Sequence, residues 1–208
     1  YDPAGYQAGF AVVAKTLASQ KWIAQCRRVI WVSSTRVYRE SEGGWVDEHS
    51  PLNLDEAQAG SMIAGEAAIR RAATATIIRP AGVYGDPEGM LMRRVQAGEG
   101  GATDALYGNR IHREDLSRLI AHCLESDHAG QAVPPTMVGA DHDQAPTHEI
   151  EDWLADQIGV TLNRPSDPSP PRAHRRCRNS LLERIGFTLS YPTWREGYRA
   201  ALDALAQR

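Results

Sequence analysis

Side chains suited to nucleophilic or acid/base chemistry stand at few places in this sequence. Ser34 directly follows a short apolar run, where its hydroxyl could serve as a nucleophile. No base lies next to Ser34 in the sequence, so nucleophilic catalysis would need a histidine from elsewhere in the chain. Ser34 therefore indicates a site only if the fold brings other polar groups to it.

The segment around His142 combines residue types that bind metals. His142 lies between Asp141 and Asp143, and His148 follows six residues later. This spacing matches no standard ligand pattern, and the run Gln144-Ala145-Pro146 between the two histidines is typical of a turn. We therefore expect no metal site here.

Composition excludes several classes of protein. The 208 residues suffice for one sizeable core, or for one core with a small appendage, and the net charge is −3. This charge gives no reason to expect a nucleic-acid partner or an anionic membrane surface, and no apolar run approaches the ~18 residues of a spanning helix. The three cysteines are scattered, which favours reduced thiols and a cytoplasmic protein.

The elements that must position Ser34 can be predicted from periodicity. Apolar runs rich in β-branched residues predict buried strands, and apolar residues at helical spacing predict helices. Helix, strand, helix and strand follow one another with short links, an order that predicts an α/β fold with a parallel sheet. The predicted helices are 5–19, 55–72, 89–96 (within a long loop, 85–108), 114–125 and 147–158, and the predicted strands are 28–33, 76–79 and 133–139.

Helix-start and helix-end signals mark the C-terminal part of the chain. Ser180 with Glu183 and Thr193 with Glu196 both fit a capping box, in which two side chains satisfy free backbone N–H groups at the start of a helix. Gly186 is expected to end the first of these two helices.

Two motifs resemble those of a known family. The run SSTRVY at 33–38 follows a predicted strand and resembles the SSxxVY block of extended short-chain dehydrogenases/reductases. The run RPAGVYG at 79–85 follows the next strand and resembles their RPxxVYG block. With NRIH at 109–112 and Tyr191-Pro192, the chain is similar over essentially its whole length to bacterial NAD(P)-binding epimerase/dehydratase proteins, also called sugar-nucleotide-epimerase-like.

The resemblance implies a fold and a division into domains. The fold is the C-terminal portion of a Rossmann-type doubly wound parallel sheet with a small α+β subdomain on the substrate side. Residues 1–86, with a strand and helix from 113–140, would form the second half of the dinucleotide-binding domain. Residues 87–112 and 141–208 would form the smaller region.

The resemblance also implies that the chain is a fragment. Relatives begin with a βαβαβ half that carries a Gly-rich phosphate loop, and the chain has no such loop. At roughly 30 residues for each βαβ unit, about 70–100 residues would be missing. The alternative is a natural short protein, which would leave a long apolar sheet edge unpaired.

The cofactor implied by the resemblance is NAD or NADP. Residues of the two motifs are expected to bind it: Ser33, Ser34, Pro80, Ala81, Gly82 and Val83. Arg79 could also face the cofactor, although pairing with a neighbouring carboxylate is the stronger expectation.

The substrate implied by the resemblance is a nucleotide sugar or another small polar molecule. Arg110 and His112 lie in a segment that lines the substrate cleft of relatives, so His112 is our candidate partner for Ser34 in catalysis. The alternative is that His112 and Asn109 organise the start of the next helix. Arg172 belongs to a basic cluster at 172–178 that could bind a diphosphate or simply be solvated.

The usual catalytic pair of the family is absent from the sequence. Relatives carry a Tyr and, four residues later, a Lys on the second helix; here these positions hold Gln58 and Met62, 24 and 28 residues after Ser34. Gln has no proton that titrates near neutral pH, and Met carries neither charge nor a strong donor. Residues 55–69 contain no Tyr or Lys, so a small register error changes nothing.

Two functions therefore stay open. One is an NAD(P)-dependent epimerase, dehydratase or oxidoreductase that uses altered proton-transfer residues. The other is an inactive cofactor-binding protein that acts as a sensor or interaction partner. The resemblance also implies a homodimer through the helices 5–19 and 55–72, unless these helices are buried within one subunit.

Overall fold

A parallel three-stranded sheet forms the centre of the computed structural model, which describes residues 3–103, 106–167 and 174–207. The strand order is β1 (Val29–Val32), β3 (Ala75–Pro80) and β6 (Thr136–Gly139). Both neighbouring pairs are parallel, which confirms the predicted α/β class. Strand β6 begins three residues later than predicted because Pro134 and Pro135 have no N–H group to give to a ladder.

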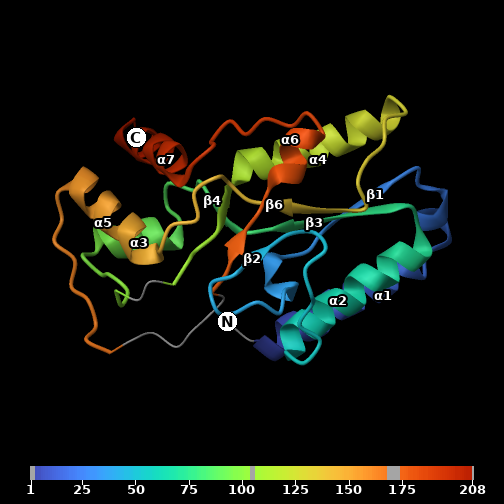
Figure 1. Cartoon of the computed structure of the whole chain (residues 1–208), viewed down its shortest axis with the longest axis horizontal. Helices are drawn as coiled ribbons and strands as arrows, with labels where there is room; N and C mark the ends of the chain where they lie inside the picture. Colours follow the sequence, from blue (N-terminus) through green and yellow to red (C-terminus); the bar gives the residue numbers. More distant parts are fainter. Residues whose placement is uncertain (1–2, 104–105, 168–173, 208) are drawn as a thin grey trace.

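Helices cover both faces of this sheet (Figure 1). Helices α1 (Pro3–Ala18) and α2 (Ala57–Ala72) lie on one face, and α4 (Arg113–His128) and α6 (Ser180–Arg184) lie on the other. The side chains of β1 alternate accordingly: Val29 and Trp31 pack with α1 and α2, whereas Ile30 packs with α4 and α6. The sheet is therefore the middle of three layers, as in doubly wound folds.

Helices α1 and α2 pack closely against each other. A Cβ atom at Gly65 would lie only 2.9 Å from the Phe10 ring and 3.3 Å from the Ala14 side chain, so glycine allows this approach. The two helices thus bury part of their surfaces against each other within one chain. A homodimer through them stays a prediction.

Two short parallel ladders extend the fold beyond the sheet. Strand β4 (Gly82–Tyr84) pairs with β5 (Arg110–His112), and β2 (Trp45–Val46) pairs with β7 (Arg176–Cys177). The sequence did not predict them, because runs of two or three residues carry no measurable periodicity.

The remaining helices form a second apolar cluster, at the left of Figure 1. These are α3 (Met90–Gln96), α5 (Thr147–Ile158) and α7 (Trp194–Ala206), and they meet through Met92, Val95, Ile150, Leu154, Trp194 and Tyr198. Two 3-10 helices, η1 (Lys21–Gln25) and η2 (Thr35–Val37), precede and follow β1. No helix in the described ranges is long and apolar enough to cross a membrane.

One of the two predicted capping boxes is present. Thr193 and Glu196 form it at the start of α7. The predicted box at Ser180 is wrong: Ser180 is already inside α6, and the N-cap is Asn179. The Asn179 amide instead donates to the carbonyl oxygens of Ala140 and Asp141, which ties α6 to the end of β6. Gly186, at φ 76°, ends α6 as predicted.

Candidate functional site

Ser34 lies where two parallel strands of the central sheet end. Val32 pairs with Ile78, and the Ser33 N–H donates to the Ile78 carbonyl at 2.7 Å. The same register continued by two residues brings Ser34 to the level of Pro80. The crevice at the carboxyl ends of strands is where open α/β sheets bind ligands. The fold thus brings the two sequence motifs together at this edge.

A chain of hydrogen bonds joins Ser34 to the start of α2. The Ser34 hydroxyl accepts from the Arg36 N–H at 3.1 Å. Arg36 donates through Nε and Nη2 to both carboxylate oxygens of Glu56, at 3.2 and 3.1 Å. Glu56 is the N-cap of α2 and accepts from the N–H groups of Gln58 and Ala59. Hydrogen bonding to Arg36 lowers the pKa of Glu56, so this carboxylate is a weak base at neutral pH.

Gln58 and Met62 both lie on the buried side of α2. Met62 packs in an apolar cluster with Val37, Tyr38 and Ala81. The helix Ala57–Ala72 presents no phenol and no ammonium group to the cleft, because its sequence contains neither Tyr nor Lys. That these two positions correspond to the family's proton-transfer pair stays a prediction; the structure places an amide and a thioether there.

A buried polar network lies directly behind Ser34. The Glu66 carboxylate accepts from Nε and Nη2 of Arg79, at 3.1 and 2.7 Å, and from the Ser33 hydroxyl at 2.6 Å. Arg79 also donates through Nη1 to the Tyr38 hydroxyl at 3.3 Å. Arg79 therefore pairs with a carboxylate, the stronger of the two expectations. The Ser33 hydroxyl is directed into the interior, while its role toward a cofactor stays a prediction.

The segment 80–83, from the end of β3 into β4, forms a wall of small residues. Pro80 and Ala81 are buried, whereas Gly82 is exposed and Val83 is 53% exposed. A Cβ atom at Gly82 would lie 3.2 Å from the Asn109 carbonyl oxygen, so the chain passes closely here. An exposed apolar side chain beside the Ser34 hydroxyl is the chemistry that the face and the carboxamide of a nicotinamide ring would need. The Met62 thioether carries no ammonium group that could donate to a ribose hydroxyl.

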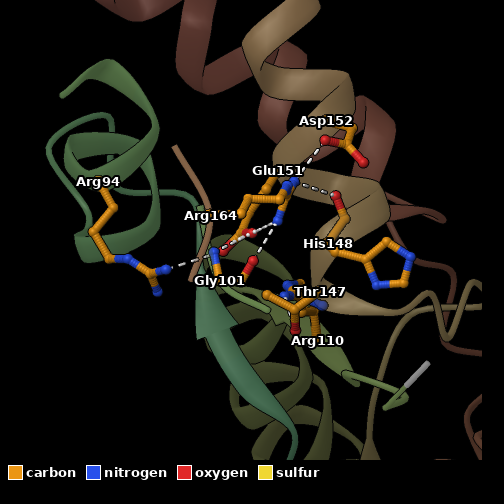
Figure 2. Close-up of polar contacts among 8 residues, drawn as sticks. All are labelled: Arg94, Gly101, Arg110, Thr147, His148, Glu151, Asp152 and Arg164. Atoms are coloured by element: carbon orange, nitrogen blue, oxygen red, sulfur yellow. Dashed lines mark hydrogen bonds and ion pairs between the residues drawn. The ribbon is translucent and has the colours of Figure 1, made fainter. Parts of the chain in front are cut away.

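Arg110 lies beside this wall, because β5 pairs with β4 and Arg110 is opposite Gly82. Its Nη2 donates to the Thr147 hydroxyl at 3.4 Å (Figure 2). Its Nη1 is buried and has no hydrogen-bond partner among the described residues. The Arg110 guanidinium thus lies at the start of α5, where the Tyr198 phenol of α7 also interacts with it.

His112 caps a helix. Its Nδ1 accepts from the Glu114 N–H at 3.3 Å at the start of α4, which leaves the proton of the neutral ring on Nε2. The ring is buried against Tyr84 and Tyr191, and burial lowers the pKa of His112. In the described part of the chain no hydrogen bond joins His112 to Ser34. This geometry favours the helix-organising interpretation.

The two tyrosines of the sequence motifs are also poorly suited to proton transfer. Burial raises the pKa of Tyr38 to about 12, and burial raises the pKa of Tyr84 as well. The Tyr84 hydroxyl donates to the Thr193 carbonyl under α7, at 3.4 Å. Neither phenol is free to serve a ligand at Ser34.

Arg175 is a residue of the site that sequence reasoning did not single out. It is buried, and its Nη1 donates to the Thr35 carbonyl at 2.5 Å, next to Ser34. Asn109 holds this arginine in place by donating to the Arg175 carbonyl and accepting from the Cys177 N–H. The only sign of it in the sequence was the basic cluster at 172–178. The sequence does not show which arginine of that cluster contacts the residue next to Ser34. Arg172 lies outside the described residues.

A second buried carboxylate organises the region around Arg110 (Figure 2). Glu151 accepts from Arg94 at 3.3 Å, from the Gly101 N–H at 2.8 Å and from Arg164 at 2.8 Å. Arg164 also reaches Asp152 at 2.5 Å. These contacts fix the loop between α3 and β5 onto α5.

The histidine and aspartate segment at 141–148 serves the fold. Asp141 is fully buried and its N–H donates to the Arg110 carbonyl, while Asp143 pairs with Arg195. Burial raises the pKa of Asp141 to about 8. Within the described ranges no three His, Cys, Asp or Glu residues are placed to hold a metal ion.

No protein-family profile matches this chain, and no curated protein matches it. Solved structures do. A Methylobacillus flagellatus protein described as an NAD-dependent epimerase/dehydratase is 26% identical, with a TM-score of 0.77, and the match covers 99% of this chain and 81% of that one.

Two further structures share the fold at lower identity. The human epimerase family protein SDR39U1, solved with NADPH, is 18% identical with a TM-score of 0.75, covering 99% of this chain and 73% of that one. A dTDP-4-dehydrorhamnose reductase from Clostridium acetobutylicum is 17% identical with a TM-score of 0.78, covering 98% and 75%.

Proposed function

We propose that this chain, which has the extended short-chain dehydrogenase/reductase fold of NAD(P)-binding epimerases and dehydratases, binds a nicotinamide cofactor along the carboxyl ends of β1 and β3. The observation that carries the proposal is the meeting of the SSTRVY and RPAGVYG segments at one sheet edge, with Gly82 and Val83 open to a ligand.

The residues that would hold the cofactor follow from this edge. The Ser34 hydroxyl would bind the carboxamide or a substrate oxygen, and the segment 80–83 would lie against the ring. When bound, the nicotinamide supplies hydride transfer. The chain itself positions and desolvates the ring, because Met62 and Ala81 close the apolar side of the wall.

The ligand that we propose beside the cofactor is a nucleotide sugar or another small polar molecule. Two similar structures are named for nucleotide-linked sugars, an NDP-hexosamine dehydratase and a dTDP-4-dehydrorhamnose reductase. Arg110 and Arg175 support this choice, since each has a buried guanidinium nitrogen that has no hydrogen-bond partner among the described residues. Arg172 would add a third cation.

A second candidate function is a cofactor-binding sensor without turnover. The observation that favours it is that the described residues place no suitable proton donor at Ser34. Gln58 and Met62 are inert, Tyr38 and Tyr84 are buried with raised pKa values, and His112 caps α4. Loss of general acid/base catalysis lowers the rate of the reaction by about 10²–10⁴-fold.

One experiment separates the two functions. The full-length protein is titrated with NADH and NADPH by fluorescence, and cofactor absorbance is then followed with a panel of nucleotide sugars. Saturable binding with turnover supports the enzyme, and saturable binding without turnover supports the sensor. Absence of binding for all cofactors would refute both.

A further inference from the structure

The Ser34 hydroxyl accepts a hydrogen bond from the protein and still has a proton to give. Its oxygen accepts from the Arg36 N–H at 3.1 Å, where Ser34 is the N-cap of η2. Among the described residues, no group accepts a hydrogen bond from this hydroxyl, and Ser34 is only partly buried. A serine hydroxyl has one proton and two lone pairs, so Ser34 can donate to a ligand oxygen while the Arg36 N–H holds it.

The Arg36 side chain is tied to the first turn of α2 by a single carboxylate. Arg36 Nε and Nη2 donate to the two oxygens of Glu56, at 3.2 and 3.1 Å. The same two oxygens accept from the N–H groups of Gln58 and Ala59, at 3.2 and 2.8 Å. Glu56 therefore joins the segment that carries Ser34 to the start of α2.

Backbone contacts hold η2 on both sides of Arg36. The Arg175 Nη1 donates to the Thr35 carbonyl at 2.5 Å, and the Asn53 N–H donates to the Val37 carbonyl at 2.8 Å. The contact with Glu56 adds a restraint at Arg36 itself, the residue whose N–H reaches Ser34.

The ion pair of Arg36 and Glu56 lies at the surface. The two side chains are 51% and 35% exposed, and exposed ion pairs contribute little to folding stability. The bidentate geometry of the pair instead restricts the orientation of Arg36. The pair is therefore better suited to holding a local conformation than to stabilising the fold.

We propose that Arg36 and Glu56 are positioning residues for Ser34. Their ion pair holds the Arg36 N–H against the Ser34 oxygen, which leaves the hydroxyl proton free to be donated to a ligand. The ligand group at Ser34 is then a hydrogen-bond acceptor, such as a carbonyl oxygen. This inference rests on the proposed function, which supplies the ligand at Ser34.

Hydrogen exchange of the Arg36 amide, measured by NMR in the ligand-free full-length protein, tests the positioning. Ser34→Ala removes the acceptor and should speed this exchange at least about tenfold. Glu56→Gln keeps an acceptor for the first turn of α2 but removes the charge, and should speed the exchange about threefold to fivefold, the most that an exposed ion pair supplies. Asp55→Asn is the matched control, since Asp55 is the preceding residue and pairs with Arg39; it should leave the exchange unchanged.

The double variant distinguishes positioning from a general effect on α2. If Glu56 acts through the contact between Arg36 and Ser34, Ser34→Ala with Glu56→Gln should exchange no faster at Arg36 than Ser34→Ala alone. Unchanged exchange in Glu56→Gln would overturn the inference. A double variant whose acceleration is the product of the two single effects would also overturn it.

Binding measurements connect the inference to the ligand. NADPH, NADH and a panel of nucleotide sugars are titrated into the same variants. Any of these ligands that Ser34→Ala weakens should also bind about threefold to fivefold more weakly to Glu56→Gln, and an unchanged affinity there would count against the positioning role. Failure of the wild type to bind either cofactor would refute the proposed function alone, because the exchange measurements need no ligand.

Discussion

Replacement of Arg79 by methionine tests the buried network behind Ser34. Arg79 is 5% exposed and Glu66 is 3% exposed, and the bidentate contact between them is 2.7 Å at its shorter bond. Removing one member of a buried ion pair costs about 3–5 kcal/mol, because the other charge is left without compensation. We therefore expect Arg79→Met to lower the free energy of unfolding by about 3–5 kcal/mol. The same change at the exposed Arg71 of α2 is the matched control and should cost less than about 0.5 kcal/mol.

Urea unfolding followed by tryptophan fluorescence measures these values, with Glu66→Leu and the double variant completing a cycle. The double variant removes both charges, so we expect it to be more stable than Arg79→Met, with a coupling free energy of about 2 kcal/mol or more. It should not reach the wild type, because the hydroxyls of Ser33 and Tyr38 lose their partners at about 1–3 kcal/mol each. A loss below about 1 kcal/mol for Arg79→Met, or strictly additive values, would refute the reasoning.

Three further predictions concern single contacts. Burial raises the pKa of Asp141 from 3.8 to about 8, so the stability that the protonated carboxyl contributes is complete below about pH 4 and is lost as pH rises to 8. Asp141→Asn removes this titration, so the fall of the free energy of unfolding with pH, measured by chemical unfolding, should become shallower over that range by about 1.4 kcal/mol per pH unit. An unchanged slope would contradict the assignment. Thr193→Ala removes the capping box of α7 and should lower the free energy of unfolding, measured by thermal melts, by about 1 kcal/mol. The control Thr188→Ala, at an exposed loop position, should leave it unchanged. Equal effects of the two substitutions would argue against the cap. Glu151→Gln weakens the clamp of Figure 2 and should speed hydrogen exchange at the Gly101 amide by at least about tenfold, and unchanged protection would show that other contacts hold the loop.

The long elements could be predicted because each has many residues with one periodicity. Helix 147–158 coincides with α5, and the strand 76–79 lies within β3. The ladders β2–β7 and β4–β5 could not be predicted, since their pairing depends on contacts between residues more than 25 positions apart. The capping propensity of Ser180 likewise did not suffice to predict where α6 begins. Asn179 is the N-cap instead, and its side-chain amide donates to the Ala140 carbonyl just after β6.

The candidate site was predictable only in part, for a similar reason. The motifs located Ser34 and the wall at 80–83, and the spacing located Gln58 and Met62. The sequence could not distinguish Arg175, which faces Thr35, from Arg176, which faces Trp45, because neighbouring residues of one type differ only in the side of the strand to which they point. It also could not show that the carboxylate beside Arg79 is Glu66, thirteen residues earlier on the facing helix.

Titration of NADPH and NADH against the full-length protein and its Val83→Asp variant tests the central claim most directly. Val83 is exposed on the proposed nicotinamide wall, and Leu124→Asp, at an exposed residue of α4, is the control. The account predicts saturable binding by the wild type and the control, and binding at least about tenfold weaker for Val83→Asp, because a carboxylate replaces an apolar contact with the ring. Wild-type protein that binds neither cofactor, or a Val83→Asp variant that binds as tightly as the wild type, would contradict it.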